Sequence, residues 1–273
     1  MISNLAYTGK ILNQMIKNRI PNEGNAENMI QRLRSYIEPV NTAWFQELKS
    51  ASDENIEKWK KHLGLEEKKL DFPPTYLEFL RYAGEGDGGL FEKTIGVKMS
   101  IESQFPYYRH VYINECDRLR PYYFEFMTTF DYNIPYLMNV GEKNNKIYFG
   151  MEQEFSGSFE KLVFQCAIQI YEHLYFSSYE SIWPTVDIFD DFDVIQQGKK
   201  LFPVLDKIVE KHHLQKAWFS DDLMYFAYTD EMSLLINCRE LGFRGILFYN
   251  QKEKVKNIKA SLISEVGVEF CKE

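Results

Sequence analysis

Between Leu70 and Leu90 the chain reads LDFPPTYLEFLRYAGEGDGGL: two adjacent prolines, a short apolar segment and then a run of glycines. A proline is tolerated in the first turn of a helix because the N–H that it lacks would have no partner there. The apolar residues that follow recur at helical spacing: Tyr76, Leu77, Leu80 and Ala83. This pattern predicts a short helix with one buried face.

Both ends of this predicted helix carry residues that suit helix termini. Upstream, Asp71 can accept a hydrogen bond from an unpaired N–H and favours the positive end of the helix dipole. Downstream, Gly84 is placed to adopt the left-handed conformation that often ends a helix. Residues 86–89 then read Gly-Asp-Gly-Gly, which predicts a tight loop.

A second helix is predicted just before the first. Asp53 can cap its start and Gly64 can end it. Its inner face carries three apolar residues: Ile56, Trp59 and Leu63. The resulting order is helix, glycine, short link, Phe-Pro-Pro, helix and glycine-rich loop.

This order resembles the SUKH superfamily, the group that contains the yeast Smi/Knr cell-wall regulators and many bacterial toxin-immunity proteins. The residues that carry the likeness are Ile56, Trp59, Leu63 and Gly64, then Phe72–Leu80, then Gly84 and the GDGG loop. Many relatives have Asn before the glycine, where this chain has Ala83.

Two further patches extend the resemblance, so that it covers roughly Asp53 to Phe176. Ile134–Gly150 (IPYLMNVGEKNNKIYFG) is similar to the family's strand–turn–strand that follows an "ipIG" pattern. Ser158–Leu162 (SFEKL) resembles the "SF..fL" opening of the family's closing helix. The resemblance implies an α+β fold in which helices flank a mixed or antiparallel sheet.

We expect three regions: a helical N-terminal extension over residues 1–50, a SUKH-like α+β domain over 51–180 and a small α+β domain over 185–273. In the extension, Asn25 can cap a helix whose apolar stripe is Met29, Ile30, Leu33 and Ile37. The best candidate for the boundary between the second and third regions is Ser177–Pro184.

Hydrophobic periodicity predicts the remaining elements. The middle region should contain a strand at 92–99, two strands within 131–149 around a turn at 141–145, and a helix at 157–176. The C-terminal region should contain helices near 196–213 and 252–264 and strands at 216–219, 224–228, 234–237, 243–249 and 267–270. Such an order is typical of helices packed on an antiparallel sheet.

The formal net charge is −8 and the isoelectric point lies near 5.3. Phosphate backbones repel an acidic surface, so a nucleic-acid partner is not expected. The chain is rich in aromatic residues, with 18 Tyr and 21 Phe. Tyrosine is amphipathic and occurs in cores and at protein interfaces.

Four scattered cysteines form no C-x-x-C pair, which argues against a zinc knuckle or a disulfide scaffold and favours a reducing cytoplasm. No signal peptide pattern and no apolar run long enough for a membrane span are evident.

Catalytic sequence patterns were not found. The sequence has no Gly-x-Ser-x-Gly elbow, no Gly-x-x-x-x-Gly-Lys phosphate loop and no His-Glu-x-x-His, and its five histidines lie at no recognisable spacing from a nucleophile. EGDGG follows a helix C-terminus and carries two acids, so it is interpreted as a turn and not as a phosphate cradle. The segment 187–193 (DIFDDFD) offers oxygen ligands that Ca²⁺ or Mg²⁺ accept, but only fragments of an EF-hand.

Three hypotheses follow. The first is a non-catalytic immunity protein that binds and neutralises a cognate toxin domain, often a nuclease, as the resemblance implies. The second is a regulatory scaffold of the Smi/Knr type, and the third is a metal-dependent hydrolase that uses the acids of 187–193. The first needs no cofactor or metal and predicts a basic protein partner, without nucleic acid or membrane. Its candidate contact residues are Glu85, Asp87, Tyr107, Tyr108, Tyr122, Tyr123, Asp187, Asp190, Asp191 and Asp193.

Overall fold

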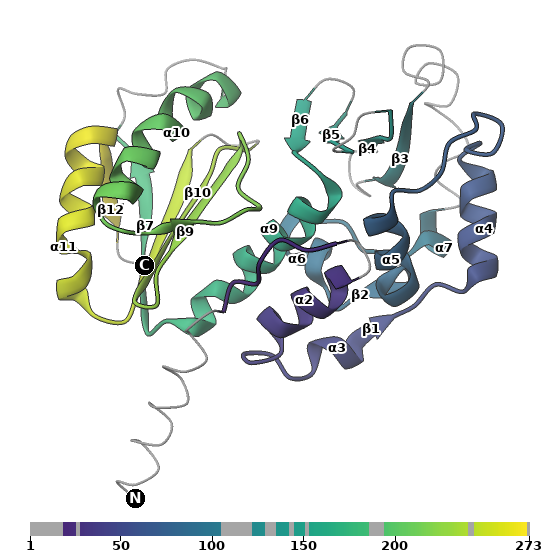
Figure 1. The fold of residues 1–273 in the computed structure, drawn as a ribbon, viewed down its shortest axis with the longest axis horizontal. Helices are drawn as coiled ribbons and strands as arrows, with labels where there is room; N and C mark the ends of the chain where they lie inside the picture. The colour runs from purple at the N-terminus through teal and green to yellow at the C-terminus, as the bar shows by residue number, and fades with distance from the viewer. Residues whose placement is uncertain are drawn as a thin grey trace, which may run out of the picture. The chain divides into compact units, whose positions relative to one another are not determined.

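The computed structural model describes residues 19–25, 28–104, 122–128, 135–141, 145–150, 153–185, 194–239 and 243–271 (Figure 1). They form an α+β fold in which every described strand pair is antiparallel. The chain divides into two compact units. The N-terminal unit is Glu23–Ile170, and the C-terminal unit combines Met1–Asn22 with Tyr171–Glu273.

The N-terminal unit contains six described helices before its last one, and two small sheets. The helices are α2 (Met29–Ile37), α3 (Trp44–Glu47), α4 (Asp53–His62), α5 (Pro74–Ala83), α6 (Leu90–Ile95) and α7 (Ile101–Gln104). A two-stranded sheet pairs β1 (Leu48–Lys49) with β2 (Gly86–Asp87). A four-stranded sheet has the order β3 (Tyr123–Thr128), β4 (Pro135–Asn139), β5 (Ile147–Phe149), β6 (Gln153–Ser156). The last helix, α9 (Phe159–Tyr171), ends at the division between the units.

Aromatic rings from α5, β3 and α9 form the centre of the N-terminal core. Tyr76 is fully buried, and its ring lies 5.0 Å from that of Phe159 and 5.8 Å from that of Phe126. The inner faces expected for α4 and α5 are confirmed, because Trp59 and Leu80 are also buried. The proline-opened helix is therefore the element on which this core is assembled.

Gly84 ends α5, but not in the predicted way. Its φ is −64°, so it keeps right-handed helical geometry and needs no left-handed freedom. A Cβ placed there would lie 2.6 Å from the backbone oxygen of Leu80 and 2.7 Å from Cβ of Ala51. The position therefore requires glycine because of close packing, whereas Gly64 after α4 does have the left-handed φ of 65°.

Helix starts also differ from the predicted caps. Ser52, and not Asp53, caps α4, since its hydroxyl accepts a hydrogen bond from the Asn55 N–H at 3.1 Å. Helix α2 has no side-chain cap from Asn25; its N-cap residue makes no such bond. Instead, the Glu78 carboxylate of α5 accepts hydrogen bonds from the N–H groups of Met29 and Ile30, at 3.1 and 3.3 Å. This buried contact makes the helix of the predicted extension an integral part of the N-terminal unit.

The segment predicted as a strand at 92–99 begins instead as helix α6. Left-handed glycines flank it, with φ of 79° at Gly89 and 69° at Gly96. The Asp87 carboxylate accepts hydrogen bonds from the N–H groups of Gly89 and Phe91, at 3.0 and 2.8 Å. The segment therefore forms a helix in spite of its apolar–polar alternation, because the Asp87 carboxylate stabilises the first helical turn.

The C-terminal unit contains one six-stranded sheet with the order β12-β7-β11-β10-β9-β8. In chain order its elements are η3 (Glu172–Tyr175), β7 (Ser178–Pro184), α10 (Val194–Lys211), β8 (Gln215–Lys216), β9 (Met224–Tyr228), β10 (Met232–Asn237), β11 (Arg244–Tyr249), α11 (Lys252–Ser261), the π-helical turn η5 (Leu262–Val266) and β12 (Val268–Cys271). The predicted helices and strands of this region are confirmed, except that β8 is only two residues long. The predicted boundary 177–184 is wrong as a linker, because it forms β7 inside this sheet.

Helices α10 and α11 cover one face of this sheet (Figure 1). Alternate strand residues point to that face, and they form a buried apolar core with residues of both helices. Ile182, Leu234 and Leu247 are among them, and each is at most 1% exposed. The side chains between them point to the opposite face, which is named here the open face because neither helix packs on it.

The tight packing at Gly84 leads to a stability prediction. Alanine is a better helix former than glycine by about 1 kcal/mol. Overpacking against backbone typically costs about 1–3 kcal/mol. We therefore expect Gly84→Ala to lower the free energy of unfolding by this packing cost minus the gain in helix propensity. Urea denaturation followed by tryptophan fluorescence measures the change.

The matched control is Gly86→Ala in the neighbouring strand β2. There a Cβ would meet only the Lys49 side chain, at 3.4 Å, which is ordinary contact. We expect that control to stay within about 0.5 kcal/mol of the unsubstituted protein. Equal stability of both variants would show that Gly84 is not closely packed.

Candidate functional site

Two of the acids predicted to contact a partner serve the loop in which they lie. Asp87 is 3% exposed, so it offers no surface contact, and that prediction is wrong. Burial raises the pKa of this carboxyl group, although the hydrogen bonds that it accepts from backbone N–H groups lower the pKa in part. Glu85 is half-buried and accepts a hydrogen bond from the Ser100 hydroxyl at 2.7 Å.

The structure does bring two predicted tyrosines to one place. Tyr122 is 55% exposed, and its ring lies against Gly141, where an added Cβ would meet it at 2.7 Å. Tyr123 accepts a hydrogen bond from the Asn139 amide at 3.2 Å, and its ring lies 5.3 Å from that of Tyr148. The other six predicted contact residues lie outside the described residues: Tyr107, Tyr108, Asp187, Asp190, Asp191 and Asp193.

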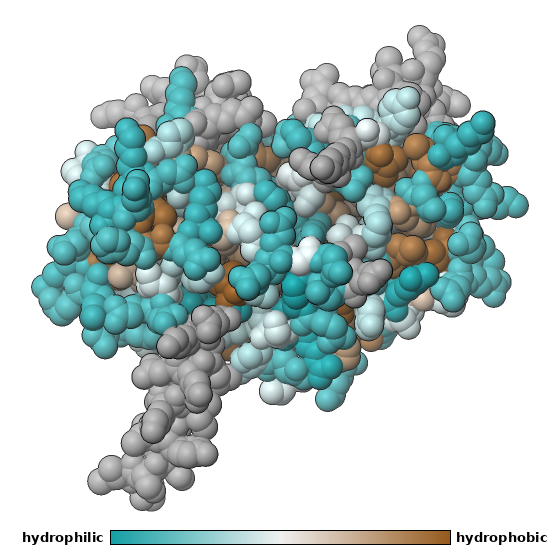
Figure 2. Space-filling model, viewed as in Figure 1, coloured by the Kyte–Doolittle hydropathy of each residue, from teal (hydrophilic) through white to brown (hydrophobic). Residues whose placement is uncertain are grey.

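Hydrophobicity alone does not single out a site. The face of the molecule in Figure 2 is largely hydrophilic, and its hydrophobic residues form separate patches. Scattered apolar residues of this kind are normal on protein surfaces. A candidate site therefore has to be found from the geometry of particular side chains.

The register of the six-stranded sheet aligns five side chains across its open face. Directly paired residues of neighbouring strands project from the same face of a sheet. The pairs are Gln215 with Tyr228, Tyr228 with Ser233, Ser233 with Phe248, and Phe248 with Tyr179. We name these five residues the cross-sheet row. Its middle is buried and its two ends are exposed.

A buried ion pair covers the middle of the row. The Arg19 guanidinium donates to the Glu172 carboxylate at 2.7 Å, and the two side chains are 1% and 0% exposed. Arg19 also donates to the Thr229 carbonyl oxygen at 3.0 Å and to the Ser233 hydroxyl, which in turn donates to Glu172. The charges of the pair are therefore balanced and its hydrogen-bonding groups are used within the unit.

Aromatic rings enclose this ion pair. The Arg19 guanidinium carbon lies 5.0 Å from the ring centre of Phe176, 5.4 Å from that of Tyr228 and 5.9 Å from that of Tyr175. Phe176 stacks in turn on Phe248 of the row, with ring centres 6.2 Å apart. Burial raises the pKa of Tyr228, which the nearby Arg19 charge partly offsets. The guanidinium thus fastens residues 19–22 and η3 onto the open face.

One end of the row carries exposed aromatic side chains. Tyr179 and Trp183 of β7 are 44% and 38% exposed and project from the open face. The Arg244 guanidinium carbon lies 5.3 Å from the Trp183 ring centre. Large aromatic side chains beside an arginine are the composition that protein interfaces favour.

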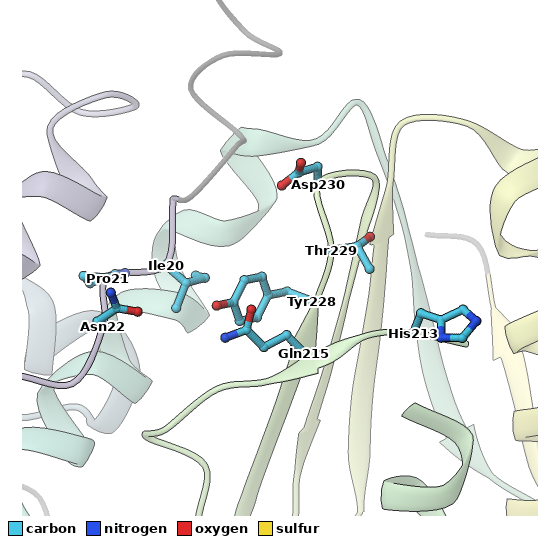
Figure 3. A pocket seen from close by; sticks show the side chains of 8 residues that line it. All are labelled: Ile20, Pro21, Asn22, His213, Gln215, Tyr228, Thr229 and Asp230. Carbon is cyan, nitrogen blue, oxygen red and sulfur yellow. The ribbon is translucent and has the colours of Figure 1, made fainter. Parts of the chain in front are cut away.

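The other end of the row opens into a pocket of about 440 Å³, which we name the β8–β9 pocket. Residues 20–22 form one wall, and His213, Gln215 and 228–230 form the rest. In Figure 3 the side chains of Tyr228 and Gln215 point toward Pro21 and Asn22, while Asp230 stands on the hairpin beyond β9. The wall at Pro21 is fixed because its carbonyl oxygen accepts a hydrogen bond from the Trp218 indole at 2.9 Å.

Polar clusters on the helix side of the sheet have structural contacts. Tyr225 donates to the Asp206 carboxylate at 2.7 Å, and Lys216 donates to the same oxygen at 2.9 Å. Tyr249 donates to Glu180 at 2.6 Å, and Lys259 pairs with the other oxygen of that carboxylate. Each cluster links a strand to a helix.

No sequence pattern predicted a serine–histidine contact, but the structure contains one. The Ser261 hydroxyl lies 2.9 Å from His212 Nε2 and accepts a hydrogen bond from Lys211 at 3.1 Å. Ser261 is 5% exposed and joins the end of α11 to the end of α10. Burial lowers the pKa of His212, which keeps the imidazole neutral and suits this contact.

Metal binding and membrane insertion find no support in the described part of the chain. No group of three or more His, Cys, Asp or Glu side chains within it could hold a metal ion. The acids of 187–193 lie outside it, so the metal hypothesis remains a prediction. None of its helices combines the length and hydropathy that crossing a bilayer requires.

No family model matches the sequence, and no curated protein or solved structure is significantly similar to it. The resemblance to the SUKH superfamily therefore stays a prediction.

The buried ion pair leads to a second prediction. Arg19→Leu would leave Glu172 buried without its partner charge, which typically costs about 3–5 kcal/mol. We expect hydrogen exchange of the β9, β10 and β11 amides to become faster by a corresponding factor, because exchange reports stability within one unit. Replacing both residues by leucine should recover part of the loss.

The matched control is Arg34→Leu in the N-terminal unit. Arg34 pairs with Glu38 at 2.8 Å, but their side chains are 36% and 41% exposed. Exposed pairs of this kind contribute about 0.3–0.5 kcal/mol. A loss at Arg19 as small as at Arg34 would contradict the role given to the buried pair.

Strand β3 leads to a prediction about pH. Burial raises the pKa of Glu125 to about 7, from the ordinary value of 4.5. Between these two values the folded protein binds more protons than the unfolded chain, so the free energy of unfolding falls as pH rises through this range. Glu125→Gln should remove that decline and add roughly 1–3 kcal/mol of stability above pH 7.

Urea denaturation at several pH values between about 5 and 8 measures this effect. Glu57→Gln on the exposed side of α4 serves as the control, and its pH profile should match that of the unsubstituted protein. If Glu125→Gln keeps the original pH slope, the side chain is not buried in its neutral form.

Proposed function

We propose that this protein is a non-catalytic binding module, and that its best-fitting role is that of an immunity protein which captures and neutralises a basic toxin domain. The observation that carries the proposal is the cross-sheet row. It ends in exposed aromatic side chains on one side and in a polar pocket on the other, on a sheet face that α10 and α11 leave open. A surface that includes both ends of the cross-sheet row is suited to bind another protein.

The charge of the chain supports a basic partner. The net charge is −8, and complementary charge accelerates the association of two proteins, toward ~10⁸–10⁹ M⁻¹s⁻¹ at low salt. Many toxin nucleases are cationic because their substrates are polyanions. An acidic inhibitor therefore both attracts such an enzyme and competes with its substrate. The cytoplasm, where a toxin would meet its target, is the proposed location.

Exposed aromatic side chains supply the proposed anchors. A few buried aromatic or arginine contacts usually dominate the binding energy of an interface. Trp183, Tyr179 and Arg244 at the β7 end of the open face meet that description. Tyr122 and Tyr123 of the N-terminal unit remain proposed as a second contact.

The role is tested with the toxin domain encoded beside the gene of this protein. We expect the full chain to co-purify with that domain and to abolish its activity at equimolar concentration. The association rate should fall as salt is added, since exposed charges are screened. Trp183→Ala should weaken the complex on the order of 10-fold or more, as loss of an anchor does.

Tyr82→Ala is the control, because Tyr82 is equally exposed, at 39%, but belongs to the N-terminal unit and is not part of the row. Its affinity should stay within about 2-fold of the unsubstituted protein. Unchanged toxin activity at a saturating concentration of this protein would contradict the immunity role. Equal effects of the two variants would sink the open face as the contact surface.

A further inference from the structure

Three polar side chains of the β8–β9 pocket have no hydrogen-bonding partner among the described residues. Gln215, Tyr228 and Asp230 make no side-chain hydrogen bond or ion pair there, although the Tyr228 ring lies against Arg19. His213 also lines the pocket, but its ring points away from the other three in Figure 3. The polar groups nearby differ from them. Thr229, for example, accepts hydrogen bonds from the N–H groups of Glu231 and Met232, at 3.1 and 3.2 Å. We propose that Gln215, Tyr228 and Asp230 line the binding site of an arginine side chain of the partner protein, an inference that rests on the protein-binding function proposed above.

The charge balance of the pocket favours a cation. Arg19 and Glu172 neutralise each other beneath Tyr228. Lys216 pairs with Asp206 at 2.9 Å, and Glu231 pairs with Lys254 at 3.0 Å. Among the described residues, this leaves the exposed carboxylate of Asp230 as the acidic group of the pocket wall without an ion-pair partner. A ligand with one positive charge completes the balance.

The hydrogen-bonding groups favour a guanidinium over other cations. Arginine carries five N–H donors in one plane and no acceptor. The side chains that line the pocket include several acceptors: the two oxygens of Asp230, the amide oxygen of Gln215 and the hydroxyl of Tyr228. A carboxylate can accept two parallel bonds from the guanidinium fork, which an ammonium cannot provide.

Shape and position suit a side chain that is presented by an extended segment. The volume of about 440 Å³ exceeds that of one guanidinium, so part of the presenting backbone can also enter. Strand β8 is the outermost strand of the sheet on this side, with a partner strand on one edge only among the described residues. Extended segments bind readily along such edges. A neutral sugar fits less well, because Arg19 already occupies one side of the Tyr228 ring.

The test uses the full chain labelled with ¹⁵N and N-acetyl-arginine amide as the probe. We expect saturable shifts of the Gln215, Thr229 and Asp230 amide resonances, with millimolar affinity. N-acetyl-citrulline amide has the same shape without the charge, and it should bind about 10-fold more weakly or not at all, as expected when a charge-assisted pair is lost. Asp230→Asn should weaken arginine binding by a similar factor.

Asp222→Asn is the matched control, because it removes the same exposed charge from the same unit outside the pocket. It should bind the arginine probe as the unsubstituted protein does. Equal binding of the citrulline probe, equal loss in both variants, or shifts spread over the acidic surface would each overturn the assignment. A lysine probe that binds as tightly as arginine would also overturn it.

Failure of this inference can be told apart from failure of the proposed function. If the pocket is wrongly assigned but the function is right, the chain neutralises the toxin while Asp230→Asn neutralises it equally well. If the function is wrong, the arginine probe still binds the pocket and the toxin stays active.

Discussion

The ion pair between Arg19 and Glu172 joins three parts of the C-terminal unit that are distant in sequence. Arg19 lies 153 residues from Glu172 and 210 residues from Thr229, and it bonds both. Two opposite charges buried together are stable only when each is satisfied by further hydrogen bonds, and here Ser233 and a backbone carbonyl provide them. Because the pair holds residues 20–22 in place, it also builds one wall of the β8–β9 pocket. The β8–β9 pocket therefore depends on the Arg19–Glu172 ion pair, although neither residue lines it.

Much of the local structure could be predicted from the sequence, because local patterns determine it. Pro74–Ala83 has a proline at its start and apolar residues at helical spacing, and it forms the helix expected. Five of the six strands of the C-terminal sheet alternate or are continuously apolar and were predicted, whereas the segment of β7 was predicted to be a domain boundary. Asn145 adopts the left-handed conformation that suits the turn between β4 and β5.

What could not be predicted depends on contacts between distant residues. Gly84 is required by the approach of Ala51 and not by its own φ, which only the assembled packing reveals. Asp87 was predicted to be an exposed loop acid, yet its buried carboxylate accepts hydrogen bonds from the N–H groups of Gly89 and Phe91 at the start of α6. The cross-sheet row combines residues from five strands, and nothing in the sequence states their register. The SUKH resemblance spans roughly residues 53–176, mostly within the N-terminal unit, whereas the candidate pocket lies in the other one.

The polar groups of the C-terminal unit fall into two kinds. Those between the helices and the sheet, such as Asp206 and Glu180, bond to a tyrosine and a lysine and thereby fix the helices. Three of those in the β8–β9 pocket, Gln215, Tyr228 and Asp230, make no side-chain hydrogen bond with the residues that the structure describes. Buried polar groups without partners are costly, but groups at an open pocket are hydrated and exchange water for a ligand. This difference supports the proposal that the β8–β9 pocket binds a ligand.

The discontinuous C-terminal unit has a consequence for biosynthesis. Arg19 leaves the ribosome long before Ser233, which follows 214 residues later. At translation rates of roughly 5–20 residues per second, the arginine waits roughly 10–40 s for its partner strand. Residues 23–170 are synthesised within that interval and are complete before Ser233 emerges. The amino-terminal segment must therefore remain accessible on the nascent chain until the last strands emerge, and chaperones that bind it would act in this interval.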